Sequence, residues 1–173
     1  MKNIITRRKT RGQIAGQVFI YIMAIIVIGG IALVGYGAIK KILVKSCDAE
    51  KANFNNDLLG LIEKWNSDQS VWPVTLKAPC EYDTVCFVDA TDMNTNLDAA
   101  KCTNPIIRSS VKAGNLQDIF VISNSATIPI GYSDLVSLNI TYQHGCLCIK
   151  QKNSNFYITL KGHGSNTEIT STK

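Results

Sequence analysis

Six cysteines are the residues of this chain with the most readable chemistry. They are Cys47, Cys80, Cys86, Cys102, Cys146 and Cys148. An even number of cysteines in an oxidising compartment predicts structural disulfides, although sequence alone leaves their connectivity open. Cys146 and Cys148 stand two residues apart in a segment typical of a β-strand, so their side chains share one face. We expect each to pair with a cysteine elsewhere.

The competing chemistry is a metal site. Its ligands would be His144, Cys146 and Cys148, with Cys80 or Cys86 as the fourth. Zinc sites usually contain a closely spaced Cys-x-x-Cys pair, and this sequence has none. We therefore predict disulfides and no metal ion or other cofactor.

Catalytic side chains are scarce. His144 and His163 are the two histidines, and neither lies in a nucleophile or metal motif. Asp89 and Asp92 follow a short apolar run, where strand-end carboxylates can bind calcium or act as an acid/base pair. No third oxygen-rich element stands at a fixed spacing, so we predict that these aspartates and His144 form turns. With no phosphate-binding loop or nucleophile elbow either, we expect no catalytic residues and no enzyme activity.

The N-terminal part of the chain indicates what carries these residues. From Ile14 to Ile39 the sequence is almost unbroken apolar, with Gln17 and Tyr21 as polar interruptions. As a helix this run would span roughly 39 Å, more than the roughly 30 Å hydrocarbon core of a bilayer. It is longer than the apolar region of about 7 to 15 residues in a cleaved signal peptide. The sequence therefore predicts a transmembrane helix in the lipid bilayer.

Charge on the two flanks predicts the orientation of this helix. Five cations precede the apolar run, three follow it, and residues 1–45 contain no Asp or Glu. By the positive-inside rule the N-terminus stays cytoplasmic and the rest is extracytoplasmic. Of the 18 Lys and Arg, 8 precede residue 46, which leaves 10 against 13 acidic residues and a net charge of −3 in the exported part. A nucleic-acid partner is therefore not expected.

The segment after the membrane is predicted to continue as an amphipathic helix. Its apolar residues gather on one side of a helix with 3.6 residues per turn: Phe54, Leu58, Leu61, Ile62 and Trp65. Trp72-Pro73 is expected to close the helical region, because proline disfavours helical geometry in the residue before it.

Short apolar runs bounded by turn residues then predict β-strands. They are Val71 to Leu76, Val85 to Val88, Ile119 to Ile122, Leu135 to Tyr142, Cys146 to Gln151 and Phe156 to Lys161. The last two are predicted to form a hairpin through Lys152-Asn153-Ser154-Asn155. Thr91 to Asn115 is expected to be a long loop or a short helix held by Cys102, and Gly162 to Lys173 a frayed polar tail.

The predicted fold class is α+β. A long N-terminal transmembrane helix is extended by an amphipathic helix and followed by a small disulfide-stabilised antiparallel β-sheet head. The expected segments are a cytoplasmic basic leader (1–12), the transmembrane helix (13–45), the amphipathic helix (46–70), the extracytoplasmic β-rich head (71–161) and the polar tail (162–173).

The junction Arg11-Gly12-Gln13, directly before the apolar run, resembles the class III signal of archaeal type IV pilin-like proteins. In that family a membrane peptidase cuts between the Gly and the Gln, and the mature protein keeps an apolar helix that can pack into a filament core. The resemblance implies that Gly12 ends the leader and Gln13 begins the mature chain. Gln17 then takes the fifth mature position, where many pilins have Glu.

These observations lead to a prediction of function. We expect a single-pass, cell-surface membrane protein without catalytic activity, either a pilin-like subunit or a minor member of such an assembly. The candidate assembly residues are Gln17 and the stripe of Phe54, Leu58, Leu61 and Trp65, and the candidate partners are identical or related pilin-like subunits. The alternatives are an anchored binding or adhesion domain that does not polymerise, and a tethered thiol or metal protein using Cys146 and Cys148.

One modification motif accompanies this prediction. Asn139-Ile140-Thr141 matches the N-glycosylation acceptor pattern, which is used only on the exported side of a membrane. Because the motif falls in a predicted strand, its other interpretation is an edge-strand asparagine that faces water.

Overall fold

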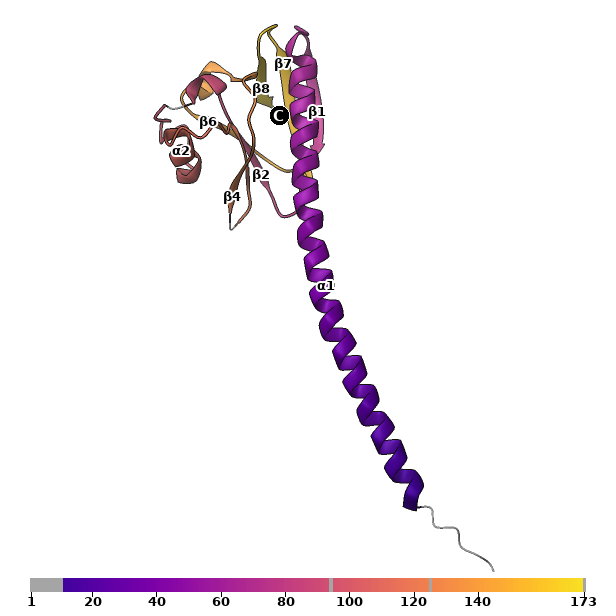
Figure 1. The fold of residues 1–173 in the computed structure, drawn as a ribbon. Coiled ribbons are helices and arrows are strands. Elements are labelled where there is room, and N and C mark those ends of the chain that lie inside the picture. Colours follow the sequence, from indigo (N-terminus) through magenta and orange to yellow (C-terminus); the bar gives the residue numbers. More distant parts are fainter. Residues whose placement is uncertain (1–10, 94, 125, 173) are drawn as a thin grey trace, which may run out of the picture. The chain divides into compact units, whose positions relative to one another are not determined.

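The structure of the protein is a computed structural model that describes residues 11–93, 95–124 and 126–172, with side chains from residue 17 onward except at residue 44. The chain divides into two compact units, Met1–Ser46 and Cys47–Lys173. Helix α1 (Arg11–Asn66) begins in the first unit and ends in the second. The α+β prediction is confirmed: a long N-terminal helix precedes two mainly antiparallel sheets (Figure 1).

Helix α1 ends earlier than predicted, at Asn66 rather than at residue 70. The Asp68 side chain accepts a hydrogen bond from the backbone N–H of Ser70 at 3.1 Å, which favours a local turn over another helical turn. Two groups from the C-terminal part of the chain satisfy carbonyls of the last helical turns. Thr167 Oγ1 donates to the Ile62 carbonyl at 2.9 Å, and the Gly164 N–H donates to the Asn66 carbonyl at 2.9 Å.

The first sheet, called sheet A, contains four strands in the order β1-β7-β8-β5. All its pairs are antiparallel except β5 with β8, which is parallel. Figure 1 shows β1, β7 and β8 beside the C-terminal part of α1. The strands are β1 (Val71–Lys77), β5 (Val136–Leu138), β7 (Asn155–Gly162) and β8 (Thr167–Ser171).

The second sheet, called sheet B, is fully antiparallel, with the strand order β4-β3-β2-β6. Its strands are β2 (Thr84–Val88), β3 (Ile119–Ile122), β4 (Thr127–Gly131) and β6 (Cys146–Lys150). Every residue of β2 is buried, so this central strand packs on both faces of the sheet. Three further short elements flank it: η1 (Ala90–Asp92), α2 (Pro105–Lys112) and η2 (Ile140–Tyr142).

One hydrophobic core joins α1 to both sheets. Phe54, Leu58 and Ile62 supply the helical side chains, and the Phe54 ring meets that of Phe156 edge to face with 5.6 Å between centroids. Alternate residues of the strands complete the core, as the period of two in a strand requires. From sheet A these include Phe156, Ile158, Leu160 and Ile169; from sheet B, Val85, Phe87, Val121 and Leu147.

A second, smaller core lies on the other face of sheet B. Helix α2 contributes Ile107 and Val111, which pack with Phe120 and Val88. Asn104 caps this helix through hydrogen bonds from the N–H groups of Ile106 and Ile107, and Pro105 occupies the first turn. The segment 91–115, predicted as a loop or short helix held by Cys102, therefore contains both, and Cys102 is fully buried in this core.

Three predictions about the strands are wrong. The turn at Lys152 to Asn155 forms, with reciprocal backbone hydrogen bonds of 2.8 and 3.0 Å and positive φ at Asn153 and Ser154. However, β6 pairs with β2, and β7 pairs with β1 and β8, so the turn passes the chain from one sheet to the other instead of closing a hairpin.

The other two wrong predictions concern which residues form strands. The predicted strand Leu135 to Tyr142 is β5 only as far as Leu138, because Asn139 caps η2 and turns the chain. The predicted frayed tail instead contains β8, an interior strand of sheet A, in which Thr167 and Ile169 are fully buried. Its polar sequence gave no strand signal, since four of its five residues, all except Ile169, are polar or charged.

Candidate functional site

The most unusual surface in the first unit is the apolar face of α1. Its large side chains are exposed from Val18 to Leu43, reaching 79% exposure at Leu33 and 75% at Val34. Soluble proteins rarely leave such a continuous apolar surface in water. By length and composition this helix could cross a membrane, and among the described residues it is the one helix that is long and apolar enough to do so.

The predicted processing junction lies at the beginning of this helix. Residues 1–10 of the predicted leader lie outside the described residues, while Arg11, Gly12 and Gln13 have helical backbone in the first turn of α1. Their side chains also lie outside the description. Gln17, the other polar candidate at this end, has an exposed side chain.

The residues of the predicted assembly stripe pack against the protein's own hydrophobic core. Phe54 and Leu58 are 4% and 0% exposed, and Leu61 and Trp65 are partly buried against the same core. The stripe does lie on one face of the helix, as its spacing predicts, and it packs against the sheets of the second unit. Phe54 and Leu58 therefore have no surface left for a neighbouring subunit.

All six cysteines form disulfides. The pairs are Cys47–Cys80, Cys86–Cys148 and Cys102–Cys146. Cys146 and Cys148 pair with other segments, as their spacing predicts. Because their sulfurs are used in disulfides, the metal site with His144 does not form, and no group of His, Cys, Asp and Glu among residues 17–172 as described is placed to hold a metal ion.

Each disulfide joins elements that are distant in sequence. Cys86 and Cys148 face each other in the register of β2 and β6, with 4.0 Å between their Cα atoms. Cys102–Cys146 attaches the loop before α2 to the same strand β6. Cys47–Cys80 connects α1 to the loop between β1 and β2, where Glu50 Oε2 also accepts a hydrogen bond from the Cys80 N–H at 3.0 Å.

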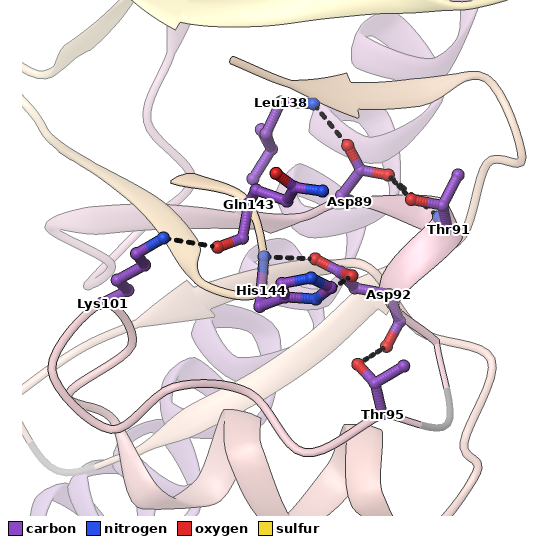
Figure 2. A network of polar contacts seen from close by, with 8 residues as sticks. All are labelled: Asp89, Thr91, Asp92, Thr95, Lys101, Leu138, Gln143 and His144. Atoms are coloured by element: carbon purple, nitrogen blue, oxygen red, sulfur yellow. Dashed lines mark hydrogen bonds and ion pairs between the residues drawn. The ribbon is translucent and has the colours of Figure 1, made fainter. Parts of the chain in front are cut away.

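Asp89 and Asp92 hold backbone groups rather than a ligand (Figure 2). Asp89 is 9% exposed; its Oδ1 accepts from the N–H and hydroxyl of Thr91, at 2.9 and 2.6 Å. Its Oδ2 accepts from the Leu138 N–H at 2.8 Å. The prediction that these aspartates form turns is confirmed, since Asp89 caps η1.

His144 completes this network from the other side. Its N–H donates to Asp92 Oδ2 at 2.7 Å, and its Nδ1 lies 2.8 Å from Asp92 Oδ1 (Figure 2). The backbone of His144 has φ of 56°, the left-handed geometry of a turn, as predicted. Lys101 Nζ donates to the Gln143 carbonyl at 3.0 Å, so three side-chain contacts hold this turn. The contacts between His144 and Asp92 span 52 residues and have no local sequence signature.

Asp118, fully buried directly before β3, was not a candidate from sequence. Both of its carboxylate oxygens accept from the Ser133 N–H, each at 3.2 Å. Burial raises the pKa of Asp118 to about 7, against the opposing effect of that hydrogen bond, and the negative charges of Asp134 and Asp89 add to the increase. In the sequence, a single aspartate before an apolar run does not predict a buried carboxylate that binds the backbone of Ser133.

The three aspartates share one target, which we call the crossover segment, residues 133–144. Asp118 holds Ser133, Asp89 holds Leu138 and Asp92 holds His144. The chain leaves sheet B after β4, forms β5 in sheet A and returns to sheet B at β6. The aspartates therefore fix the passage between the sheets, which is a structural role.

Asn139, the predicted glycosylation site, lies in a turn rather than in a strand. Its Oδ1 accepts from the N–H and hydroxyl of Thr141, at 3.1 and 3.2 Å, and its Nδ2 donates to Glu168 Oε1 at 3.0 Å. Hydrogen bonding from His163 to the other Glu168 oxygen, followed by that from Asn139, lowers the pKa of Glu168 against the effect of burial. The nitrogen that would carry a sugar is therefore already engaged.

We compared the chain with protein-family models, with curated proteins and with solved structures. No family model, curated protein or solved structure matches it.

Proposed function

We propose that the protein is a single-pass membrane protein with a cytoplasmic N-terminus and an extracytoplasmic, disulfide-bonded head, and that it acts as a pilin-like subunit. The observation that carries this proposal is the exposed apolar helix from residue 17 to residue 43, which directly follows Arg11-Gly12-Gln13. In the pilin-like family, cleavage before the apolar segment leaves that segment on the mature chain and available for packing.

Two further features support the proposed location. The three disulfides all lie in residues 47–173, which fits an oxidising compartment for this unit. The cations before the span outnumber those after it by five to three, which favours a cytoplasmic N-terminus.

The proposal also identifies the surface that would assemble. Because Phe54 and Leu58 are buried in their own core, subunit contacts fall to the exposed part of α1 instead. Three glycines in this part, Gly29, Gly30 and Gly35, have no atom within 4 Å of an added Cβ, so a neighbouring helix could approach closely there.

Processing is tested by the mass of the N-terminal peptide of the protein from its native cells. We expect an N-terminus at Gln13, and we expect Gly12→Val to block cleavage while the matched control Gly16→Val is processed normally. Recovery of residues 1–12 on the mature wild-type protein would contradict the pilin-like proposal.

Assembly requires a separate measurement. A photo-cross-linking residue at position 33 should join identical or related subunits in native membranes, whereas one at the exposed head position 140 serves as control. The alternative function, an anchored binding domain that does not polymerise, is favoured by the internal burial of Phe54 and Leu58. A processed protein that gives no cross-link at position 33 would support that alternative.

A further inference from the structure

We propose that the C-terminal end of the apolar span contains a binding site for one anionic phospholipid headgroup, formed by Lys40, Lys41 and Lys45 above Gly37. The inference rests on the proposed function, because it requires α1 to lie in a bilayer. All of its residues belong to the first unit of the chain.

The site begins with a hollow on the helix surface. An open concavity of about 620 Å³ is lined by Gly37, Lys40, Lys41, Ile42 and Lys45. Gly37 is the first lining residue along the helix, and no atom lies within 4 Å of where its Cβ would be. The missing side chain leaves room for a ligand against the helix backbone.

Helical geometry places cations above this hollow and apolar groups below it. Residues three and four positions apart are neighbours on a helix surface, so Lys40 and Lys41 flank Gly37 on one side along the axis. Leu33 and Val34 flank it on the other, with 79% and 75% of their surface exposed. The arrangement matches the two parts of a phospholipid, with a headgroup beside the lysines and an acyl chain along Leu33 and Val34.

The lysine side chains are expected to converge. Long side chains on a helix point toward its N-terminus and cover the preceding turn. Lys40 and Lys41 therefore extend over Gly37, and Lys45 extends toward Lys41. All three are exposed, so their ammonium groups can approach one phosphate.

Among the residues that the structure describes, no carboxylate forms an ion pair with this cluster. Residues 1–47 contain no Asp or Glu, and none of the ion pairs formed by the described residues involves Lys40, Lys41 or Lys45. The next acidic residue, Asp48, is paired with Lys51 at 2.6 Å, and Glu50 accepts from the Cys80 N–H. We therefore expect an anion from outside the chain to balance the positive charge of these three lysines.

The position along the helix selects a lipid over a soluble anion. From Gln17 to Ile39 the helix rises roughly 34 Å, slightly more than the roughly 30 Å hydrocarbon core. Lys40 and Lys41 therefore meet the headgroup layer at the exit of the span. Each lysine near an anionic surface contributes about 1 kcal/mol, which corresponds to roughly five-fold in binding.

The test uses the full chain reconstituted in vesicles of mixed phosphatidylcholine and phosphatidylglycerol, with native mass spectrometry of the lipids that remain bound. We expect the wild type to retain phosphatidylglycerol preferentially. Replacement of the three lysines (K40Q/K41Q/K45Q) should reduce that preference by roughly five-fold per lysine. The control K112Q/K150Q/K152Q makes the same charge change on exposed residues of the head and should retain the preference.

A second pair of variants tests the hollow itself. Gly37→Leu keeps every charge and fills the space, and it should lose the retained lipid, whereas Gly30→Leu, also at an open position, should keep it. Equal lipid preference in wild type and K40Q/K41Q/K45Q would overturn the inference. So would normal retention by Gly37→Leu, which would leave only diffuse charge attraction.

Extraction at alkaline pH separates this inference from the proposed function. A chain that resists extraction but shows no lipid preference refutes the lipid site alone. A chain that is extracted from the vesicles refutes the membrane span, and the site with it. Lysine-dependent dimers in vesicles of phosphatidylcholine alone would instead assign the cluster to an acidic group of a second copy, contrary to the inference.

Discussion

The Oδ2 atom of Asp89 accepts a hydrogen bond from the N–H of Leu138 at 2.8 Å, across 49 residues of sequence. Asp89 follows β2 of sheet B, and Leu138 ends β5 of sheet A. One buried carboxylate thus joins the two sheets at the crossover segment. Asp89 is therefore a structural residue, and its removal should lower the stability of the whole head.

Replacement of Asp89 by Ala is expected to lower the free energy of unfolding by about 2 to 4 kcal/mol. The change leaves the Leu138 N–H unsatisfied in a buried position and removes the cap of η1. Chemical denaturation of the full chain in detergent micelles, followed by tryptophan fluorescence, measures it. Asp57→Ala, at an exposed helical position, is the control and should change stability by less than about 0.5 kcal/mol.

Stability of the head is expected to decrease as pH rises from about 4 toward 7. The pKa of Asp118 is raised to about 7 in the folded protein, against about 3.9 when unfolded. Between these values the folded state binds one proton more than the unfolded state, so the stabilisation is complete below pH 4 and is lost as pH rises through 7. Its maximum slope is about 1.4 kcal/mol per pH unit.

Asp118→Asn tests this assignment, because asparagine keeps the shape and does not titrate. The variant should remove this component from the pH profile of unfolding free energy, and Asp57→Asn should keep it. A profile for Asp118→Asn that parallels the wild type would show that another group titrates.

Peptide mapping without reduction should recover three linked pairs, Cys47–Cys80, Cys86–Cys148 and Cys102–Cys146. Replacing both Cys102 and Cys146 by Ser is expected to cost about 2 to 4 kcal/mol in unfolding free energy. The same change at Cys102 alone should also leave a free thiol on Cys146, detectable with a thiol reagent after unfolding. Recovery of a peptide in which Cys146 is linked to Cys148 would refute this connectivity.

Gly162→Ala is expected to destabilise the head, whereas Gly60→Ala should be neutral or stabilising. A Cβ at residue 162 would collide with the carbonyl oxygens of Trp65 and Asp68, which are backbone atoms and cannot move aside. Gly60 lies in α1 with open space around it, so alanine there gains about 0.5 to 1 kcal/mol of helix propensity. Thermal unfolding of the two variants should therefore shift in opposite directions.

Features that depend on one-sided burial could be predicted from the sequence. The stripe from Phe54 to Trp65 repeats with the period of a helix because one face packs on the sheets. The alternation of Phe156, Ile158 and Leu160 with polar residues follows from the single buried face of β7. In both cases the spacing of apolar residues within one element reflects which face of that element is buried.

Features that depend on distant pairing could not be predicted in this way. The turn at Asn153 and Ser154 is encoded locally, but no local signal says that β6 and β7 join different sheets. Strand β8 is polar because Thr167 satisfies a helix carbonyl instead of filling an apolar core. Asp118 has no distinctive neighbours in sequence, and only the approach of Ser133 gives it a role.

The placement of β8 has a consequence for how this protein is made. Strand β8 lies between β7 and β5, and Thr167 and Gly164 satisfy the last carbonyls of α1. Sheet A cannot close, and the end of α1 cannot be capped, until residues 164–171 have been synthesised. Folding of the head is therefore completed only after these residues are made, and a truncation that removes them would leave β7 and β5 without their shared neighbour and the end of α1 without two hydrogen-bond donors.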